Sequence, residues 1–146
     1  MNGFPCIMQL SHIERNGPDP ELRKLVSEIC DGLPSLFHGV RVRPSILHGD
    51  LWSGNWAFAD GQPVIYDPAV YCGHAEAELS ILTLFGSPSA AFFDAYLATM
   101  GGPDPGHEDR RNLYQLYHLM NHYAIFGGAF RSQSIAAARN VLRAIR

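Results

Sequence analysis

The segment His48-Gly-Asp-Leu-Trp-Ser-Gly-Asn55 places a carboxylate, Asp50, and an amide, Asn55, in one short polar stretch. A second carboxylate, Asp67, follows twelve residues after the amide. One amide oxygen and one carboxylate suit Mg²⁺, a hard cation that keeps some waters and takes further ligands from substrate phosphates. Asp50 would stay off the metal and accept the proton of an attacking hydroxyl. The spacing therefore indicates a site for phosphoryl transfer.

Two short apolar runs between Asn55 and Asp67 predict a β-hairpin. They flank Asp60-Gly61, and aromatic and β-branched residues around an Asp-Gly pair are typical of a hairpin. A three-residue loop, 60–62, would place Asn55 opposite Asp67 with both side chains on one face. A two-residue loop would place Asn55 opposite Tyr66 and turn the side chains to the wrong side. The metal-site interpretation therefore predicts the three-residue loop.

A purely structural interpretation of these residues stays open. Asp67 would cap the turn at Pro68, and Asp50 would accept hydrogen bonds from the backbone of its own loop. A bare His-x-Asp string favours this interpretation, because short motifs often occur without function. The added presence of Asn55 and Asp67 at these spacings favours the metal site.

Several separated motifs resemble the fructosamine kinase family, also called ketosamine-3-kinases or protein-ribulosamine 3-kinases. They are segment 48–55, Val64-Ile-Tyr-Asp-Pro-Ala69, Tyr71-Cys-Gly-His-Ala-Glu-Ala-Glu-Leu79 and a later stretch over 113–127. The resemblance runs from about residue 20 to the end. It implies an α+β, mainly helical fold: the C-terminal lobe of a protein-kinase-like, aminoglycoside phosphotransferase-like fold, with a catalytic loop and a small β-hairpin.

The resemblance also implies an activity and its residues. Family members phosphorylate the 3-hydroxyl of ketosamines, the sugar adducts on small amines or glycated proteins, with ATP and Mg²⁺. By match to the family motif, Asp50 is the catalytic base, and the metal ligands are Asn55 and Asp67. His48 matches the histidine that opens the catalytic loop, as a structural brace rather than a proton carrier. Protein kinases share the Asp-to-Asn spacing, but Asp67-Pro-Ala differs from their Asp-Phe-Gly. The resemblance therefore favours the small-molecule branch.

Three further residues are candidates for substrate contact. The indole of Trp52 could stack on a sugar ring, or it could be a core aromatic beneath the loop. His74 or Glu76 could border the ketosamine pocket, where an acid would hold the secondary ammonium of the substrate. Alternatively, Glu76 and Glu78 mark a helix start, because the helix dipole favours acids in the first turn.

His118 and His122 are four residues apart, the helical spacing of half a zinc site. No Glu stands between them in the place that a zinc motif requires, and no third ligand stands out. We therefore expect hydrogen-bonded histidines rather than a metal site.

Composition limits the classes of function. The chain has 146 residues, 47% of them hydrophobic, and a formal net charge of −3, as expected for one soluble globular domain. The absence of basic stripes argues against nucleic acid as a partner, and no apolar stretch approaches the roughly 20 residues of a membrane helix. Three widely spaced cysteines suit a reducing compartment. We expect an intracellular, cytoplasmic location, with a plastid as the alternative; the oligomeric state stays open.

Turn and cap signals divide the chain. Residues 1–19 are expected to be irregular, because Pro5, Asn16-Gly17 and Pro18 interrupt them, and 20–146 to form the kinase-like lobe. Asp19 is expected to cap a helix that ends near Gly32. We expect an extended segment and four later helices. Their ranges are 43–47, then about 75–85, 89–100, 109–126 and 133–145.

The sequence contains no Gly-rich loop and no lysine-bearing strand, and Lys24 is its one lysine. In kinases these parts belong to an N-terminal lobe that holds ATP. We therefore expect a C-lobe without its N-lobe, inactive alone because phosphoryl transfer depends on positioning. A non-catalytic ketosamine-binding or scaffold module stays open. A metal-dependent phosphoesterase is weaker, because such enzymes gather more carboxylates and histidines around two metals.

Overall fold

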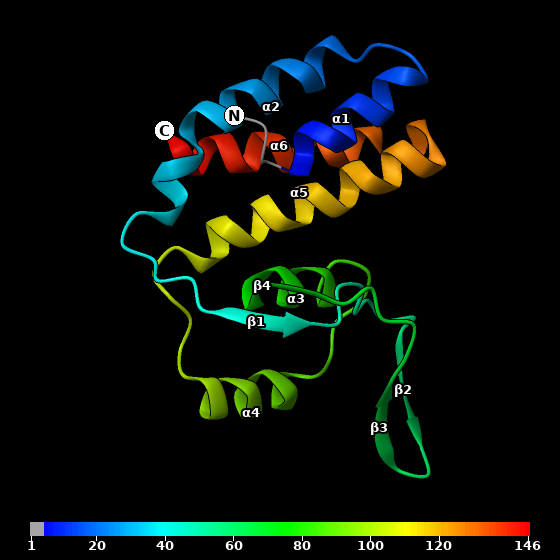
Figure 1. Cartoon of the computed structure of the whole chain (residues 1–146), viewed down its shortest axis with the longest axis vertical. Helices are drawn as coiled ribbons and strands as arrows, with labels where there is room; N and C mark the ends of the chain where they lie inside the picture. Colours follow the sequence, from blue (N-terminus) through cyan, green and yellow to red (C-terminus); the bar gives the residue numbers. More distant parts are fainter. Residues whose placement is uncertain (1–4) are drawn as a thin grey trace. The chain divides into compact units, whose positions relative to one another are not determined.

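The structure of the protein is a computed structural model that describes residues 5–146 (Figure 1). Six α-helices and two small antiparallel sheets make up the regular structure of this range, which confirms the expected mainly helical α+β class. The chain divides into two compact units, residues 1–39 with 108–146 and residues 40–107. Each unit is described by itself. No helix among the described residues is long and apolar enough to cross a membrane.

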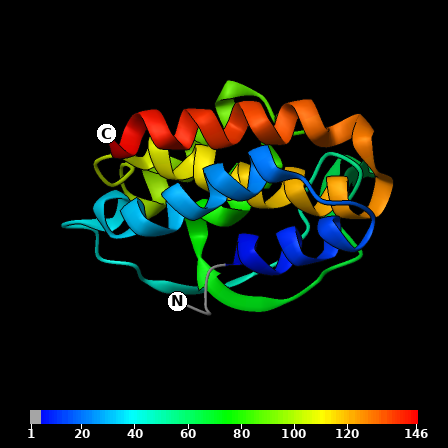
Figure 2. The same cartoon turned by 90° about the horizontal axis from the view of Figure 1, so that it is seen from above.

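The first unit is helical. Its elements are α1 (Pro5–Arg15), α2 (Pro20–Gly32), the 3₁₀ turn η1 (Leu33–Phe37), α5 (His107–Phe126), the 3₁₀ turn η2 (Gly128–Phe130) and α6 (Arg131–Ile145). Helix α2 packs along α6, as both views show (Figure 1, Figure 2). Apolar side chains from α1, α2, α5 and α6 form one buried cluster. Burial of such side chains is the main force that holds the unit together.

Residues 5–15 form helix α1, so the expectation of an irregular segment up to residue 19 is wrong for this stretch. Cys6, Gln9 and Ile13 are buried, and their spacing puts them on one helix face. Pro5 stands at the first helical position, where its missing N–H costs nothing. The turn signals therefore act only after Arg15. Residues 1–4, which the same expectation covers, lie outside the described range.

Asp19 caps α2 as expected: its carboxylate accepts a hydrogen bond from Leu22 N at 3.1 Å. Arg131 donates to the same carboxylate from Nε at 2.7 Å, and the Tyr123 hydroxyl donates at 3.1 Å. Burial of the carboxyl by itself raises the pKa of Asp19, but the hydrogen bonds from Arg131, Leu22 N and Tyr123 hold it below its ordinary value. This one residue thus connects α2 to α5 and α6.

The second unit contains the four strands found among the described residues. Strand β1 (Pro44–Leu47) pairs antiparallel with β4 (Tyr71–His74), and β2 (Trp56–Ala59) pairs with β3 (Gln62–Ile65). Helices α3 (Ala75–Leu82) and α4 (Ala90–Met100) follow β4. The extended segment and the four later helices are confirmed, with ends that differ by up to three residues. Strand β4 was not expected, because its partner is distant in sequence.

The turn between β2 and β3 has two residues, so the predicted three-residue loop is wrong. Ala59 pairs with Gln62, and Asp60 and Gly61 adopt φ angles of 51° and 75°. Positive φ at both turn residues is the geometry that matches the twist of paired strands. Tyr66 N donates to Asn55 O at 3.1 Å, so Asn55 lies opposite Tyr66 rather than Asp67.

Candidate active site

The loop 48–55 leaves β1 and enters β2, and its start is fixed against the segment after β3. Gly49 has a φ of 84°, and a Cβ there would lie 2.1 Å from the carbonyl oxygen of Ala69. No side chain fits in this space. Ala69 N donates to His48 O at 2.8 Å. The loop and the residues that follow Asp67 are therefore in direct backbone contact.

His48 uses both ring nitrogens inside the protein. Nδ1 accepts a hydrogen bond from Asp50 N at 3.3 Å, and Nε2 lies 2.8 Å from the carbonyl oxygen of Tyr66. An imidazole nitrogen that accepts carries no proton, so the proton of the neutral ring is on Nε2 and is donated to Tyr66. This arrangement favours a bracing role for His48 over that of a proton carrier.

Asn55 is buried and its amide group is turned toward Asp50. Nδ2 donates to the carbonyl oxygen of Asp50 at 2.8 Å and to its carboxylate Oδ2 at 3.1 Å. Because both bonds use the amide nitrogen, Oδ1 keeps its lone pairs for another partner. Asp50 accepts from this side chain and from no backbone amide among the described residues. The structural interpretation, in which Asp50 accepts hydrogen bonds from the backbone of its own loop, therefore does not match the observed geometry.

Asp67 follows β3 with an exposed side chain and a φ of 54°, a left-handed conformation that is uncommon outside glycine. Its carboxylate makes no hydrogen bond or ion pair within residues 5–146, so it does not cap the turn at Pro68. The structure thus joins His48, Asp50 and Asn55 by hydrogen bonds and places Asp67 one residue beyond the partner of Asn55. Asp67 lies beyond the end of β3, and its left-handed backbone departs from the extended conformation of a strand.

Two contacts with α3 and the residues after it hold the loop, and sequence reasoning missed both. The carboxylate of Glu78 accepts from Gly49 N at 2.9 Å and from Leu51 N at 3.3 Å. The hydroxyl of Ser53 donates to the carbonyl oxygen of Phe85 at 2.5 Å. Glu78 does stand in the first turn of α3, as the dipole argument predicted. No local signal gives its second partner, because the contact spans more than 25 residues of chain.

Trp52 is 39% exposed, and its ring lies over Gly54. A Cβ on Gly54 would come within 2.3 Å of the indole carbons. The ring is therefore held against the loop on one side and open to solvent on the other. This partial exposure favours the substrate-contact interpretation over a core aromatic.

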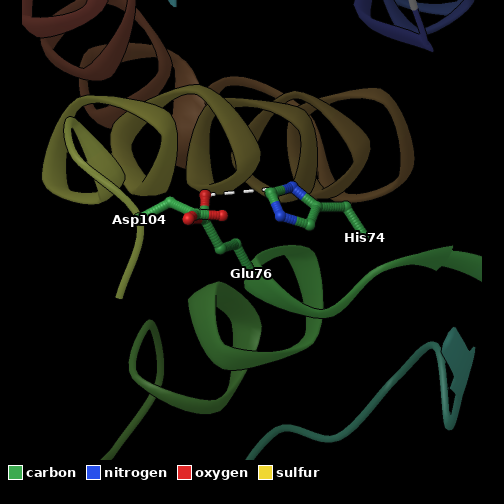
Figure 3. Close-up of side chains that lie close together, drawn as sticks. All are labelled: His74, Glu76 and Asp104. Atoms are coloured by element: carbon green, nitrogen blue, oxygen red, sulfur yellow. Dashed lines mark ion pairs between the residues drawn. The ribbon is translucent and has the colours of Figure 1, made fainter. Parts of the chain in front are cut away.

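His74, Glu76 and Asp104 converge, as Figure 3 shows. His74 ends β4, Glu76 is in the first turn of α3, and Asp104 precedes α5. His74 Nδ1 lies 3.8 Å from Glu76 Oε2, and one ligand atom from each residue lies within 4.8 Å of the others. Burial, followed by the charge of Glu76, raises the pKa of the nearby Tyr96. The group concentrates negative charge beside a histidine.

The late histidines on α5 have protein partners. His122 Nδ1 lies 2.9 Å from the carbonyl oxygen of His118, and its ring contacts Phe126 and Phe130. Burial, and then the neighbouring His122, lower the pKa of His118 to about 4. Within residues 5–146, neither histidine belongs to a group of three metal-ligating side chains. His122 is hydrogen-bonded, as expected for this pair.

The sequence profile of the fructosamine kinase family matches residues 6–144. The chain belongs to the fructosamine kinase family. The match includes α1, so the relationship extends further toward the N-terminus than residue 20. Ketosamine kinases are phosphotransferases, and the fold and the motif of 48–55 agree with this membership.

Individual relatives agree with the family assignment. Ketosamine-3-kinase of Mus musculus is 40% identical over 133 residues, which cover 91% of this chain and 43% of the mouse protein. A chloroplastic protein-ribulosamine 3-kinase of Oryza sativa subsp. indica is 39% identical over 139 residues, with coverage of 94% and 40%. The chain therefore spans less than half of the length of these relatives.

A solved structure of the same family has the same fold. It is a protein of Thermobifida fusca YX-ER1 provisionally assigned as a fructosamine-3-kinase, determined by crystallography. The two structures superpose with a TM-score of 0.83 at 36% sequence identity. The match covers 92% of this chain and 47% of the other. This fructosamine kinase chain thus has the fold of the corresponding part of its relative.

Proposed function

We propose that the protein takes part in ATP- and Mg²⁺-dependent phosphorylation of the 3-hydroxyl of ketosamines, on small amines or on glycated proteins. The observation that carries this proposal is the orientation of Asn55, whose Nδ2 is bonded to Asp50 and whose Oδ1 is left for another partner. Membership of the fructosamine kinase family supports it, as does the similarity to the mouse ketosamine-3-kinase and the rice protein-ribulosamine 3-kinase.

The donor set around the loop suits Mg²⁺. Asn55 Oδ1 and the carboxylate of Asp67 are hard oxygen ligands, and Asp67 has no competing hydrogen bond within residues 5–146. Mg²⁺ held there would neutralise charge on the transferred phosphate. The paired strands place Asn55 opposite Tyr66, and the left-handed backbone of Asp67 departs from the extended conformation of a strand. The proposal requires that Asp67 can turn its carboxylate toward the Mg²⁺ held by Asn55.

Asp50 is the proposed general base. Its carboxylate accepts the proton of the sugar hydroxyl while that oxygen bonds to the γ-phosphorus of ATP, and the bond from this phosphorus to the bridging oxygen breaks to leave ADP. The Asn55 amide holds the carboxylate in place at 3.1 Å. His48 braces the loop through Tyr66 and the amide of Asp50, and it moves no proton.

The substrate would be recognised by the residues around the loop. The solvent-facing side of the Trp52 ring is proposed to stack on the sugar. His74 and Glu76 are proposed to border the amine end, where the carboxylate of Glu76 would attract a secondary ammonium. We propose a cytoplasmic location, or a plastid as for the rice relative, and a partner that is a ketosamine rather than a nucleic acid.

A transfer assay tests the proposed function. The chain is incubated with labelled ATP, Mg²⁺ and a fructosamine or ribulosamine, both alone and fused behind the preceding segment of the mouse relative, of which this chain covers 43%. We expect label on the ketosamine with the fusion and none with the chain alone. Ketosamine binding by calorimetry without any transfer in either form would instead favour a non-catalytic binding module.

A further inference from the structure

We propose that α3 and the residues after it position the loop 48–55 through two anchors: the carboxylate of Glu78, which holds the backbone on both sides of Asp50, and the carbonyl of Phe85, which holds Ser53. Both anchors come from one short segment, the helix and the three residues that follow it. The catalytic consequence of this arrangement rests on the proposed function. The positioning itself is independent of it.

The first anchor fixes the backbone on both sides of Asp50. One carboxylate oxygen of Glu78 accepts from Gly49 N, and the other accepts from Leu51 N. The amide between them, that of Asp50, donates to His48. Three successive backbone amides therefore have acceptors, two of them on an ionised group, and such charge-assisted bonds are stronger than neutral ones. The peptide planes that carry Asp50 are held from both directions.

The second anchor acts near the end of the loop. Ser53 Oγ donates to Phe85 O at 2.5 Å. Gly86 lies directly against this contact, because a Cβ there would be 3.1 Å from both Cβ and Oγ of Ser53. Its φ of 118° is also one that other residues rarely adopt. The backbone at Phe85 and Gly86 thus packs closely against Ser53, which lies two residues before Asn55.

The template that carries these anchors is itself fixed. Ala77, Ile81 and Leu82 of α3 are buried, with exposed fractions of 8%, 2% and 2%. Because protein interiors have little free volume, a packed helix holds the residues that it contacts in fixed positions. The loop contains the proposed base and one proposed metal ligand, so a shift of either anchor would displace both together. We therefore regard Glu78 and Ser53 as positioning residues that act through Asp50 and Asn55.

Amide hydrogen exchange measured by NMR on the full chain tests each anchor without any activity assay. In Glu78→Gln a carboxamide offers one oxygen where the carboxylate offers two, so the amide of Gly49, Leu51 or both should exchange about tenfold faster or more. Ser53→Ala should accelerate exchange of the Asn55 amide, which donates to Trp52 O, and leave Gly49 and Leu51 protected.

Two matched variants serve as controls. Glu28→Gln removes a carboxylate that pairs with Arg146 on the surface, and Ser87→Ala removes a hydroxyl that bonds only to Pro88 O among the described residues. Neither should change exchange in 48–55. Circular dichroism verifies that each variant is folded. Unchanged exchange at Gly49 and Leu51 in Glu78→Gln, or at Asn55 in Ser53→Ala, would overturn the corresponding anchor.

Kinetics then separate positioning from the proposed function. In the form of the protein that transfers phosphate, each anchor variant should lower kcat by about a hundredfold with KM unchanged, because displacement of a catalytic group affects the transition state and not substrate binding. A change in KM alone would contradict the positioning role. Absence of transfer in the unaltered protein, with the exchange pattern intact, would overturn the proposed function and leave the two anchors standing.

Discussion

The side-chain amide of Asn55 donates to the carbonyl oxygen of Asp50 at 2.8 Å and to its carboxylate at 3.1 Å. This pair connects the end of the loop 48–55 to its middle. It also leaves Oδ1 of Asn55 and Oδ1 of Asp50 available to other hydrogen-bond or metal partners. Stability and the proposed chemistry both depend on it.

Removal of this amide should destabilise the protein. Asn55→Ala leaves the Asp50 carbonyl without its donor in a partly buried position, so we expect a loss of about 1–3 kcal/mol in the free energy of unfolding. Urea denaturation measures this loss. Asn112 provides the control, because its Nδ2 donates to Glu108 O in an exposed position. Asn112→Ala should cost less than about 0.5 kcal/mol, and equal losses in the two variants would contradict the account.

The carboxylate of Asp19 should make stability depend on pH. The pKa of Asp19 in the folded protein is below the ordinary 3.8. Its contribution to the free energy of unfolding is therefore complete above pH 3.8 and is lost as pH falls through the folded-state pKa. In Asp19→Asn, the free energy of unfolding should therefore fall less steeply as pH is lowered into the acid range. Chemical denaturation over the acid range, down to about pH 2, is the measurement. An acid limb of the same slope in both proteins would contradict the assignment.

His118 should contribute a second pH dependence, at higher pH. Its folded-state pKa is about 4, against 6.5 for an ordinary histidine, so the unfolded chain binds the proton first. Stability should rise with pH between these values, by at most about 1.4 kcal/mol per pH unit from this residue. His118→Phe should remove that slope. If the variant retains it, another group is responsible.

The two-residue turn between β2 and β3 makes a further prediction. Gly61 has a φ of 75°, so Gly61→Ala should destabilise the protein by about 1 kcal/mol through backbone strain alone. A Cβ at Gly61 or at Gly102 would meet no other atom within 4 Å, and Gly102 is not in the left-handed region, which makes Gly102→Ala the matched control. Thermal unfolding compares the two. A Tm shift in the control equal to that in Gly61→Ala would argue against strain.

Local signals in the sequence are sufficient for most of the fold. Asp19 followed by Pro20 predicts both the start of α2 and its cap, and glycines mark the helix ends. The expectation of an irregular segment fails over α1, because Pro5 and Asn16-Gly17 lie at its two ends and interrupt nothing between them. Cys6, Gln9 and Ile13 share one buried face, and their helical spacing is the signal that could have revealed the helix.

The sequence motif suggests residues for the candidate site but does not predict its geometry. The motif indicates Asp50, Asn55 and Asp67, but the register that would make the last two face each other does not form. The Asp-Gly turn adopts its preferred two-residue form, and Asp67 has a left-handed backbone with a φ of 54°. The roles of Glu78 and Ser53 could not be predicted from the sequence, because tertiary packing determines their hydrogen-bond partners. Neither the backbone angle of Asp67 nor the long-range contact of Glu78 leaves a local pattern in the sequence.

Asp50 is the proposed base for ATP-dependent phosphorylation of a ketosamine. The most direct measurement compares the rate of phosphate transfer to fructosamine by the fused protein and by its Asp50→Asn variant, with product identified by mass spectrometry. We predict transfer to the 3-hydroxyl by the first and a loss of about 10²–10⁴-fold in the second, because the amide cannot accept the proton. Equal rates for the two proteins would show that Asp50 is not the base.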